Sequence, residues 1–206
     1  MSATLQSILW PLLSYLVGSI PSAVIAAKLF RLEDPRKTGS GNPGATNVLR
    51  SGNKFAAFLT LLGDLLKGLI PVALALHYGL SAGLTAVIAI AAFMGHLYPV
   101  FLGFKGGKGV ATAIGVFTAL SWKLVVIFIG CWLLTAALTR YSSLAGLVAA
   151  AVTGLASFAV FNQSSQMQLI GAVIWIVAFL FQRHRPNMDR LKAGTEPKIG
   201  AKKKQE

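Results

Sequence analysis

A loop rich in glycine and small polar residues contains the first side chains that could bind a charged ligand. It reads Gly39-Ser-Gly-Asn-Pro-Gly-Ala-Thr-Asn47 and is followed by Arg50. Glycines reach positive φ and let backbone N–H groups surround an anion, and an arginine binds phosphate through two parallel hydrogen bonds. The pattern therefore favours a phosphate site. An ordinary polar turn is the alternative, because Gly, Asn and Pro also cluster in turns.

A second glycine-rich turn, which also carries two lysines, joins two apolar segments between Gly95 and Gly109. A phosphate at the start of the following helix would meet free N–H groups, the positive end of the helix dipole, and Lys108. A nucleotide-binding P-loop is excluded, because Leu102 and Gly109 stand where that motif needs glycine and a hydroxyl residue. The alternative is a tight turn whose lysines reach back to the membrane surface.

The segment Arg183-His-Arg-Pro-Asn-Met-Asp-Arg-Leu-Lys-Ala-Gly-Thr-Glu196 is the third polar cluster, and it directly follows the last apolar run. It adds His184, Asn187 and Glu196 to a basic segment, which charge for membrane orientation alone does not require. Arg140 to Ser143 adds hydroxyls and another guanidinium. Both stretches also fit the simpler interpretation of basic anchors at the membrane surface.

Asp64 and Lys67 are ionisable residues within an apolar run, three positions apart and therefore on one helix face. Charged groups at such depth are costly and usually face the interior of a bundle. We expect a structural ion pair that supports the site. A proton relay in a transporter is the competing interpretation.

Several common catalytic centres are absent from the sequence. It has neither an HExxH nor a GxSxG motif, and its single cysteine, Cys131, lies inside an apolar run. A zinc hydrolase and a serine acyl-enzyme are therefore not indicated, and we expect no metal site. Of the remaining histidines, His77 is expected in an outer loop and His96 at a helix end, where it could simply pack.

Apolar runs must position all of these groups, since 55% of the 206 residues are hydrophobic and only 12% are charged. That composition predicts an all-α, polytopic membrane bundle with about seven spans of roughly 20 residues each. The runs extend from Leu5 to Phe30, Phe55 to Leu76, Leu84 to Leu102, Val110 to Leu120, Leu124 to Leu138, Leu144 to Phe161 and Leu169 to Phe181. The first is too long for a cleaved signal peptide and is expected to be a retained helix.

The positive charges alternate between the loops. Apart from Lys67 and Lys123, every Lys and Arg lies next to the loops after the first, third and fifth spans or in the segment after the seventh. The positive-inside rule then predicts a cytoplasmic C-terminus and an outside N-terminus. Orientation also explains the net charge of +13 without nucleic acid as a partner.

Taken together, the motifs resemble the bacterial acyl-phosphate:glycerol-3-phosphate acyltransferase family, commonly called PlsY. The resemblance covers nearly the whole chain. It includes Gly18-Ser-Ile-Pro-Ser22, the GSGNPGATNVLR loop, Asp64 with Lys67 and Gly68, GHLYPVFLGFKGGKGVAT, and HRPNMDRLKAGTE. It implies a single transmembrane acyltransferase domain over residues 1–200 in the bacterial inner membrane, with a cytoplasmic active site and a basic cytoplasmic tail at 201–206.

The resemblance also implies roles for individual residues. Ser40, Arg50 and Lys108 are expected to hold phosphate groups, and His184 and Asn187 to line the acyl-phosphate side; these are the candidate catalytic residues. The expected substrate-binding residues are Gly39, Gly41, Asn42, Gly44, Thr46, Asn47, Lys105, Gly106, Gly107, Gly109, Ser142, Ser143 and Glu196. No cofactor is implied.

The implied reaction moves a fatty acyl group from acyl phosphate to the 1-hydroxyl of glycerol 3-phosphate, giving lysophosphatidic acid and phosphate. Because acyl phosphate has a good leaving group, positioning and charge stabilisation can suffice without a covalent enzyme intermediate. A substrate phosphate or His184 would take the proton. Other phospholipid-synthesis enzymes are candidate protein partners beside the bilayer. A transporter for a phosphorylated metabolite and a noncatalytic scaffold remain as alternatives.

Overall fold

The computed structural model describes residues 2–200, so the predicted basic tail at 201–206 lies outside the described residues. Within them the chain is helical and contains no strand, as the sequence predicts. The α-helices and two short 3-10 turns are α1 (Ala3–Gly18), α2 (Ser22–Leu29), α3 (Ala45–Leu49), α4 (Lys54–His77), α5 (Ala82–Leu97), η1 (Val100–Leu102), α6 (Val110–Leu120), α7 (Trp122–Thr139), α8 (Ser142–Val160), η2 (Ser164–Gln166), α9 (Met167–Arg183) and α10 (Arg185–Lys192).

Six apolar helical segments are long enough to cross a membrane: Ala3–Leu29, Lys54–His77, Ala82–Leu102, Trp122–Thr139, Ser142–Val160 and Ser164–Arg183. The remaining apolar run is α6, which has 11 residues. At 1.5 Å per residue it extends about 17 Å, roughly half the thickness of a bilayer core. Residues 2–200 thus contain six segments of spanning length, whereas the sequence predicts about seven.

The first apolar run is one span made of two helices, whereas the sequence predicts one continuous helix. α1 ends at Gly18 and α2 begins at Ser22. Pro21 has no N–H to donate and disfavours a helical conformation at Ile20, so the helix stops there. The Ile20 carbonyl accepts hydrogen bonds from Lys67 Nζ and from the Ser22 N–H, both at 3.0 Å, so this backbone group stays paired at the break.

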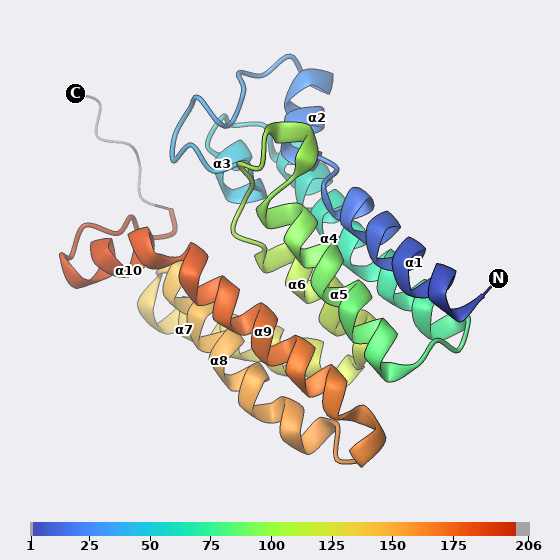
Figure 1. Cartoon of the computed structure of the whole chain (residues 1–206). Coiled ribbons are helices and arrows are strands. Elements are labelled where there is room, and N and C mark those ends of the chain that lie inside the picture. The colour runs from blue at the N-terminus through green and yellow to red at the C-terminus, as the bar shows by residue number, and fades with distance from the viewer. Residues whose placement is uncertain (1, 201–206) are drawn as a thin grey trace.

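Figure 1 shows the helices in two groups, α1 to α6 on one side and α7 to α10 on the other. In the first group α1 packs along α5 and α4 along α6; in the second α7 packs along α8. Helix α9 contacts both α8 and α5 and so links the groups. Glycines permit the tightest contacts, because a Cβ on Gly18 or Gly95 would collide with the backbone of the facing helix.

The buried core lies where the two groups meet. Phe93 of α5, Phe117 of α6, and Phe128 of α7 are fully buried in one cluster. The outer faces carry exposed leucines, isoleucines and phenylalanines, as expected of helices in contact with lipid. In that setting close van der Waals packing, rather than removal of apolar surface from water, holds the helices together.

The polar connections gather at one end of the bundle. The segment containing α3, the turn between α5 and α6, and helix α10 all lie at the end opposite the N-terminus (Figure 1). The segment after α10 reaches the α7–α8 turn, where the Ile199 N–H donates to the Arg140 carbonyl at 2.7 Å. Three sequence-distant polar segments are therefore placed together.

Candidate active site

The first wall of the candidate site is the loop that precedes α3, and Asn47 holds it in shape from within. The Asn47 Oδ1 accepts from the backbone N–H of Ser40 at 2.9 Å. Its Nδ2 donates to the carbonyls of Pro35 and Thr38, at 2.6 and 3.0 Å. Asn47 is buried and its amide is committed to the loop, whereas the Ser40 side chain is exposed. In this structure the Asn47 amide fixes the backbone of the loop around Ser40.

Positive φ angles at two glycines make this loop possible. Gly39 and Gly41 have φ of 58° and 69°, a region that side chains with a Cβ rarely adopt. A Cβ on Gly39 would also collide with the Asn47 amide. Both glycines therefore shape the backbone on either side of Ser40.

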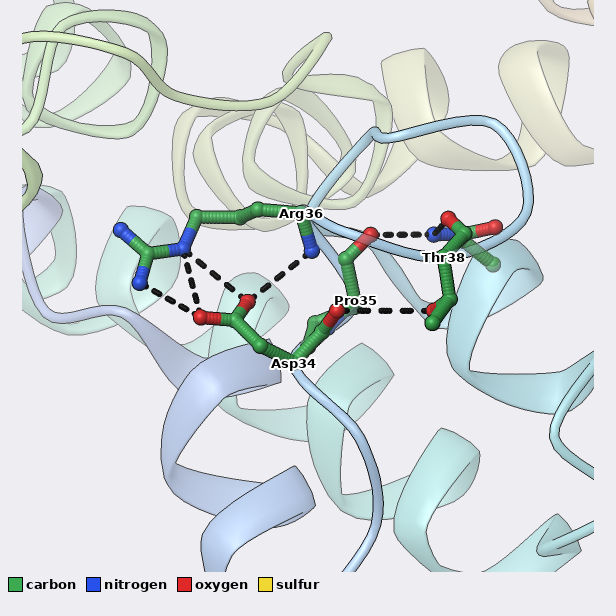
Figure 2. Close-up of polar contacts among 5 residues, drawn as sticks. Asp34, Pro35, Arg36 and Thr38 are labelled. Carbon is green, nitrogen blue, oxygen red and sulfur yellow. Dashed lines mark hydrogen bonds and ion pairs between the residues drawn. The ribbon is translucent and has the colours of Figure 1, made fainter.

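An ion pair holds the beginning of the same loop. Arg36 Nε and Nη2 donate to the Asp34 carboxylate, which also accepts from the Arg36 N–H, and the Thr38 hydroxyl reaches the Asp34 carbonyl (Figure 2). The hydrogen bonds from the Arg36 guanidinium lower the pKa of Asp34 to about 2 and raise that of Arg36. The pair is largely exposed, so it orders the loop entry more than it stabilises the fold.

Arg50 follows α3 as its C-cap and is exposed. Its side chain lies beside Gly39, since a Cβ built there would be 3.7 Å from Arg50 Cδ. Thr46 is also exposed, while Asn42 and Gly44 are half-buried and lie next to each other. The structure therefore gathers the predicted residues of the first motif within one loop and one short helix.

The Gly106-Gly107 dipeptide forms the second loop of this wall, and its backbone is fully committed within the protein. The Gly106 and Gly107 N–H groups donate to the carbonyls of Leu97 and His96, at 3.1 and 3.2 Å. A Cβ on Gly107 would collide with the His96 imidazole. The sequence predicts that these amides face a phosphate; in the structure they instead support the backbone that leads to Lys108.

Lys108 is half-buried at the end of this loop, directly before Gly109, the N-cap of α6 with φ of 89°. Burial lowers the pKa of Lys108 to about 8. Glu196 acts in the opposite direction, and the charges of Arg190, Arg50 and Arg183 add to the lowering. Lys108 is thus within electrostatic reach of both helix groups, whereas Lys105 is exposed.

The second wall comes from α8, α10 and the segment after α10, and Glu196 joins them. Its Oε1 accepts from the Ser143 hydroxyl at 2.6 Å and from Asn187 Nδ2 at 2.7 Å, and its Oε2 accepts from Arg190 Nε at 2.7 Å. Burial acts to raise the pKa of Glu196, but these three hydrogen bonds outweigh it and lower that pKa. Ser142 starts α8 beside this group.

Asn187 leaves one polar atom open. Its side chain is buried, and within residues 2–200 its Oδ1 has no hydrogen-bond partner. An amide oxygen accepts hydrogen bonds and does not donate them. Asn187 therefore offers a fixed acceptor, because its Nδ2 is held by Glu196.

His184 lies at the junction of α9 and α10 and is 4% exposed. Its Nδ1 is 2.8 Å from the Leu180 carbonyl oxygen, which can only accept, so Nδ1 carries the hydrogen. Burial lowers the pKa of His184 to about 4, and nearby Lys108 adds to the lowering. His184 is accordingly neutral at pH 7 and presents Nε2 as a weakly basic acceptor.

A buried ionic group lies below the loops. The predicted Asp64–Lys67 pair has a Nζ–Oδ1 distance of 2.8 Å, and both side chains are buried. His96 of α5 joins it, with Nδ1 3.5 Å from Asp64 Oδ1. The sequence analysis gives His96 only a packing role. Its contact with Gly107 connects this ionic group to the Lys108 loop.

A polar groove opens between the loops and α9. It has a volume of about 550 Å³ and is lined by Arg36, Lys37, Gly41, Pro43, Leu102, Phe104, Lys105, Gly106 and Arg183. Its mixture of cations and apolar side chains suits an anion that carries an acyl chain, but its lining does not include Ser40, Arg50, Lys108, His184 or Asn187. Within the described chain, no three His, Cys, Asp or Glu side chains gather as metal ligands.

Sequence reasoning missed two other arginines. Arg183 donates to the Gly106 and Gly107 carbonyls, and Arg190 binds Glu196. Both belong to the third polar cluster, in which the sequence singles out only His184, Asn187 and Glu196 as candidate site residues. Their type and position could have pointed to a structural role, but their partners lie on other segments.

The fold and the site define a class: a multi-pass integral membrane protein whose polar loops assemble a cationic site at one end of a helical bundle. The glycerol-3-phosphate acyltransferase family model matches residues 8–194. The chain belongs to this family.

Individual members of this family are similar in sequence to the chain over most of its length. The chain is 54% identical over 198 residues to the glycerol-3-phosphate acyltransferase of Bordetella petrii, covering 93% of this chain and 92% of the relative. It is 52% identical over 191 residues to that of Dechloromonas aromatica, covering 93% and 95%.

Solved structures are similar as well. The crystal structure of the glycerol 3-phosphate form of PlsY (YgiH), an integral membrane glycerol 3-phosphate acyltransferase, aligns with a TM-score of 0.87 at 38% identity, covering 94% of this chain and 96% of that one. The lysophosphatidic acid form aligns with a TM-score of 0.86 at 37% identity, covering 94% and 95%.

Proposed function

We propose that this protein transfers a fatty acyl group from acyl phosphate to the 1-hydroxyl of glycerol 3-phosphate, giving lysophosphatidic acid and inorganic phosphate. The observation that carries this proposal is that Arg183 of α9 binds the loop before Lys108, and that Lys108 lies within electrostatic reach of Arg50, His184 and Glu196. The family and the substrate and product forms of its solved member support the same reaction. They do not favour the transporter alternative.

The first wall, called the loop wall below, and the second wall, called the helix wall, suit different parts of the substrates. Arg50 and Lys108 are cations that can hold phosphate oxygens, and Ser40 adds an exposed hydroxyl donor. An acceptor has no hydrogen to give a phosphate oxygen, so Asn187 Oδ1 and His184 Nε2 suit the glycerol hydroxyls rather than the acyl phosphate that the resemblance implies. We therefore assign phosphate binding to the loop wall and orientation of the attacking alcohol to the helix wall.

The chemical step is a direct displacement. The oxygen of the 1-hydroxyl attacks the acyl carbonyl carbon, the bond from that carbon to the phosphate oxygen breaks, and phosphate leaves with the bonding electron pair. Lys108 and Arg50 stabilise the negative charge that develops. The hydroxyl proton ends on phosphate, so atoms and charge balance without an enzyme-bound acyl group.

The identity of the proton acceptor follows from basicity. With a pKa of about 4, His184 binds a proton weakly. A phosphate dianion has a second pKa of roughly 6, so it is about 100-fold more basic. We assign proton transfer to a substrate phosphate and give His184 the role of hydrogen-bond acceptor that orients the alcohol.

We further propose the topology that the positive charges favour. The cationic loops face the cytoplasm of the bacterial inner membrane, the N-terminus lies outside, and residues 1–200 form one acyltransferase domain. Helix α6 is the seventh crossing and begins directly after the cytoplasmic Lys108 loop. The gathering of nearly all loop cations at the end opposite the N-terminus supports this orientation.

A donor panel tests the reaction. Purified protein in lipid is given labelled glycerol 3-phosphate with acyl phosphate, acyl-CoA or acyl-carrier protein in separate reactions. We expect lysophosphatidic acid with acyl phosphate alone, with one phosphate released per product. Equal rates with acyl-CoA would refute the proposed donor. No product with any donor would support the noncatalytic scaffold, and full activity of the Ser40→Ala and Arg50→Ala variants would refute the roles assigned to those residues.

A further inference from the structure

Arg183, the last residue of α9, reaches across to the first helix group and binds the Lys108 loop. Its Nε donates to the Gly107 carbonyl at 3.0 Å and its Nη2 to the Gly106 carbonyl at 2.7 Å. Its guanidinium carbon lies 5.4 Å from the centre of the Tyr98 ring. One planar group thus engages two successive carbonyls and an aromatic ring.

The same dipeptide is held from the other side by α5. The Gly106 and Gly107 N–H groups donate to the carbonyls of Leu97 and His96. Arg183 donates to the carbonyls of Gly106 and Gly107, so both N–H groups and both carbonyls of the dipeptide are paired. Lys108 is the next residue, and its backbone position therefore depends on both contacts.

We infer that Arg183 is a positioning residue: it holds the Gly106-Gly107 backbone against α5 and thereby fixes Lys108 opposite the helix wall. This inference rests on the proposed acyl transfer, in which Lys108 binds phosphate. Arg183 joins the two helix groups at the site, because α9 belongs to the second group and the loop to the first. Neither motif alone predicts this contact.

The chemistry requires a guanidinium and not merely a positive charge. The fork of Nε and Nη2 donates one hydrogen bond to each of two successive carbonyls, and the guanidinium carbon lies over the Tyr98 ring. A lysine ammonium is a compact point charge on a flexible stem and cannot reproduce this geometry. Replacement by lysine therefore removes the paired hydrogen bonds to the two carbonyls and keeps the positive charge.

The test compares Arg183→Lys with Arg185→Lys, a matched change at an exposed arginine two residues away. Both variants and the wild type are assayed in lipid with acyl phosphate, and their unfolding temperatures are measured. We expect Arg183→Lys to lower kcat/KM for glycerol 3-phosphate by about 10- to 100-fold with a raised KM, because a small misplacement of a binding group is that costly. Arg185→Lys should match the wild type.

A KM change separates positioning from a loss of folded protein, which lowers the apparent kcat and leaves KM unchanged. The Arg183→Ala variant adds an independent measurement: guanidinium ion at millimolar concentration should restore part of the activity, and methylammonium should not. A wild-type KM in Arg183→Lys, or equal rescue by both cations, would overturn the inference. An inactive wild type would refute the acyl-transfer proposal instead, so the two failures are distinguishable.

Discussion

The two walls of the site are built by opposite means. In the loop wall, glycines and buried side chains fix the backbone, and exposed side chains at Ser40 and Arg50 and the half-buried Lys108 are left to bind. In the helix wall, regular helices fix the backbone, and one carboxylate, Glu196, orders the side chains around it. The loop wall presents the cations Arg50 and Lys108, whereas the helix wall presents the neutral side chains of His184 and Asn187. This difference teaches that the glycine-rich loops act mainly as scaffolds for cations.

The largest expected effect on kcat/KM comes from removing a lysine that binds phosphate, compared with a lysine outside the site. Lys108→Met should lower kcat/KM by about 10²- to 10³-fold, as loss of one group that stabilises developing charge does. Lys54→Met, at an exposed lysine that starts α4, is the matched control and should change the rate only slightly. Steady-state kinetics in lipid would measure both. Equal losses in the two variants would show that the loop contributes only diffuse charge.

Glu196→Gln tests the helix wall. The glutamine NH₂ would face donors, and Arg190 would lose its anionic partner. We expect about 3 kcal/mol of destabilisation from the broken charged hydrogen bonds, measured by thermal or denaturant unfolding. Glu33→Gln, at an exposed carboxylate, should have no effect. An unchanged unfolding midpoint in Glu196→Gln would mean that the helices order this wall without the carboxylate.

Asn47→Asp tests the internal support of the loop wall. The change replaces the Nδ2 donor by a carboxylate oxygen opposite the Pro35 and Thr38 carbonyls. Leaving these buried carbonyls unpaired should cost about 2 kcal/mol and raise the KM for both substrates. Asn162→Asp, at an exposed asparagine, is the control. A normal KM in Asn47→Asp would show that the loop conformation does not depend on Asn47.

The dependence of activity on pH tests whether the loop wall acts through the charge of Lys108. Because the pKa of Lys108 is lowered to about 8, its charge disappears as the pH rises through that value. Activity should fall about tenfold between pH 7 and 9 as the protonated fraction declines. Stability should change in the opposite sense, because a lysine whose folded pKa lies below its unfolded value destabilises the fold most when it is protonated.

His184 should contribute nothing to the profile between pH 6 and 9, because its pKa is about 4. Its stability contribution would be lost only as the pH falls below its unfolded value of about 6.5 toward the folded value, where the neutral form must charge. An acidic limb near pH 6.5 that disappears in His184→Ala would show that this imidazole titrates in the reaction.

The smallest effect concerns the ion pair at the loop entry. Asp34→Asn should change the free energy of unfolding by less than about 1 kcal/mol, because the pair is largely exposed. The pKa of Asp34 is lowered to about 2, so its contribution is present above about pH 4 and is lost as the pH falls toward 2. Unfolding at pH 7 in low and high salt would measure it. A loss above about 2 kcal/mol would make this pair part of the wall's support.

The features that the sequence predicts correctly depend on residues that are close together in the chain. Asp64 and Lys67 share a helix face by spacing alone, and the apolar run Val110 to Leu120 has the bounds of α6. The break at Pro21 was missed, because the continuous apolar run outweighs one proline when hydropathy is the signal. The assignment of the candidate site residues likewise comes from local motifs.

The partners of those residues could not be predicted, because they come from distant segments. His96 reaches Asp64 from another helix, and Arg183 reaches Gly106 across 77 positions. The glycine pattern does not reveal whether an amide faces a ligand or a neighbouring carbonyl. That outcome depends on how α5 ends, which is a tertiary feature.

The central claim is that the two walls bring both substrates together for direct acyl transfer. It is tested most directly by mixing stoichiometric protein with acyl phosphate and following phosphate release before and after glycerol 3-phosphate is added. We predict no burst of phosphate without the acceptor, and release equal to lysophosphatidic acid once the acceptor is present. A burst equal to the protein concentration, with an acyl group retained on the protein, would contradict the account.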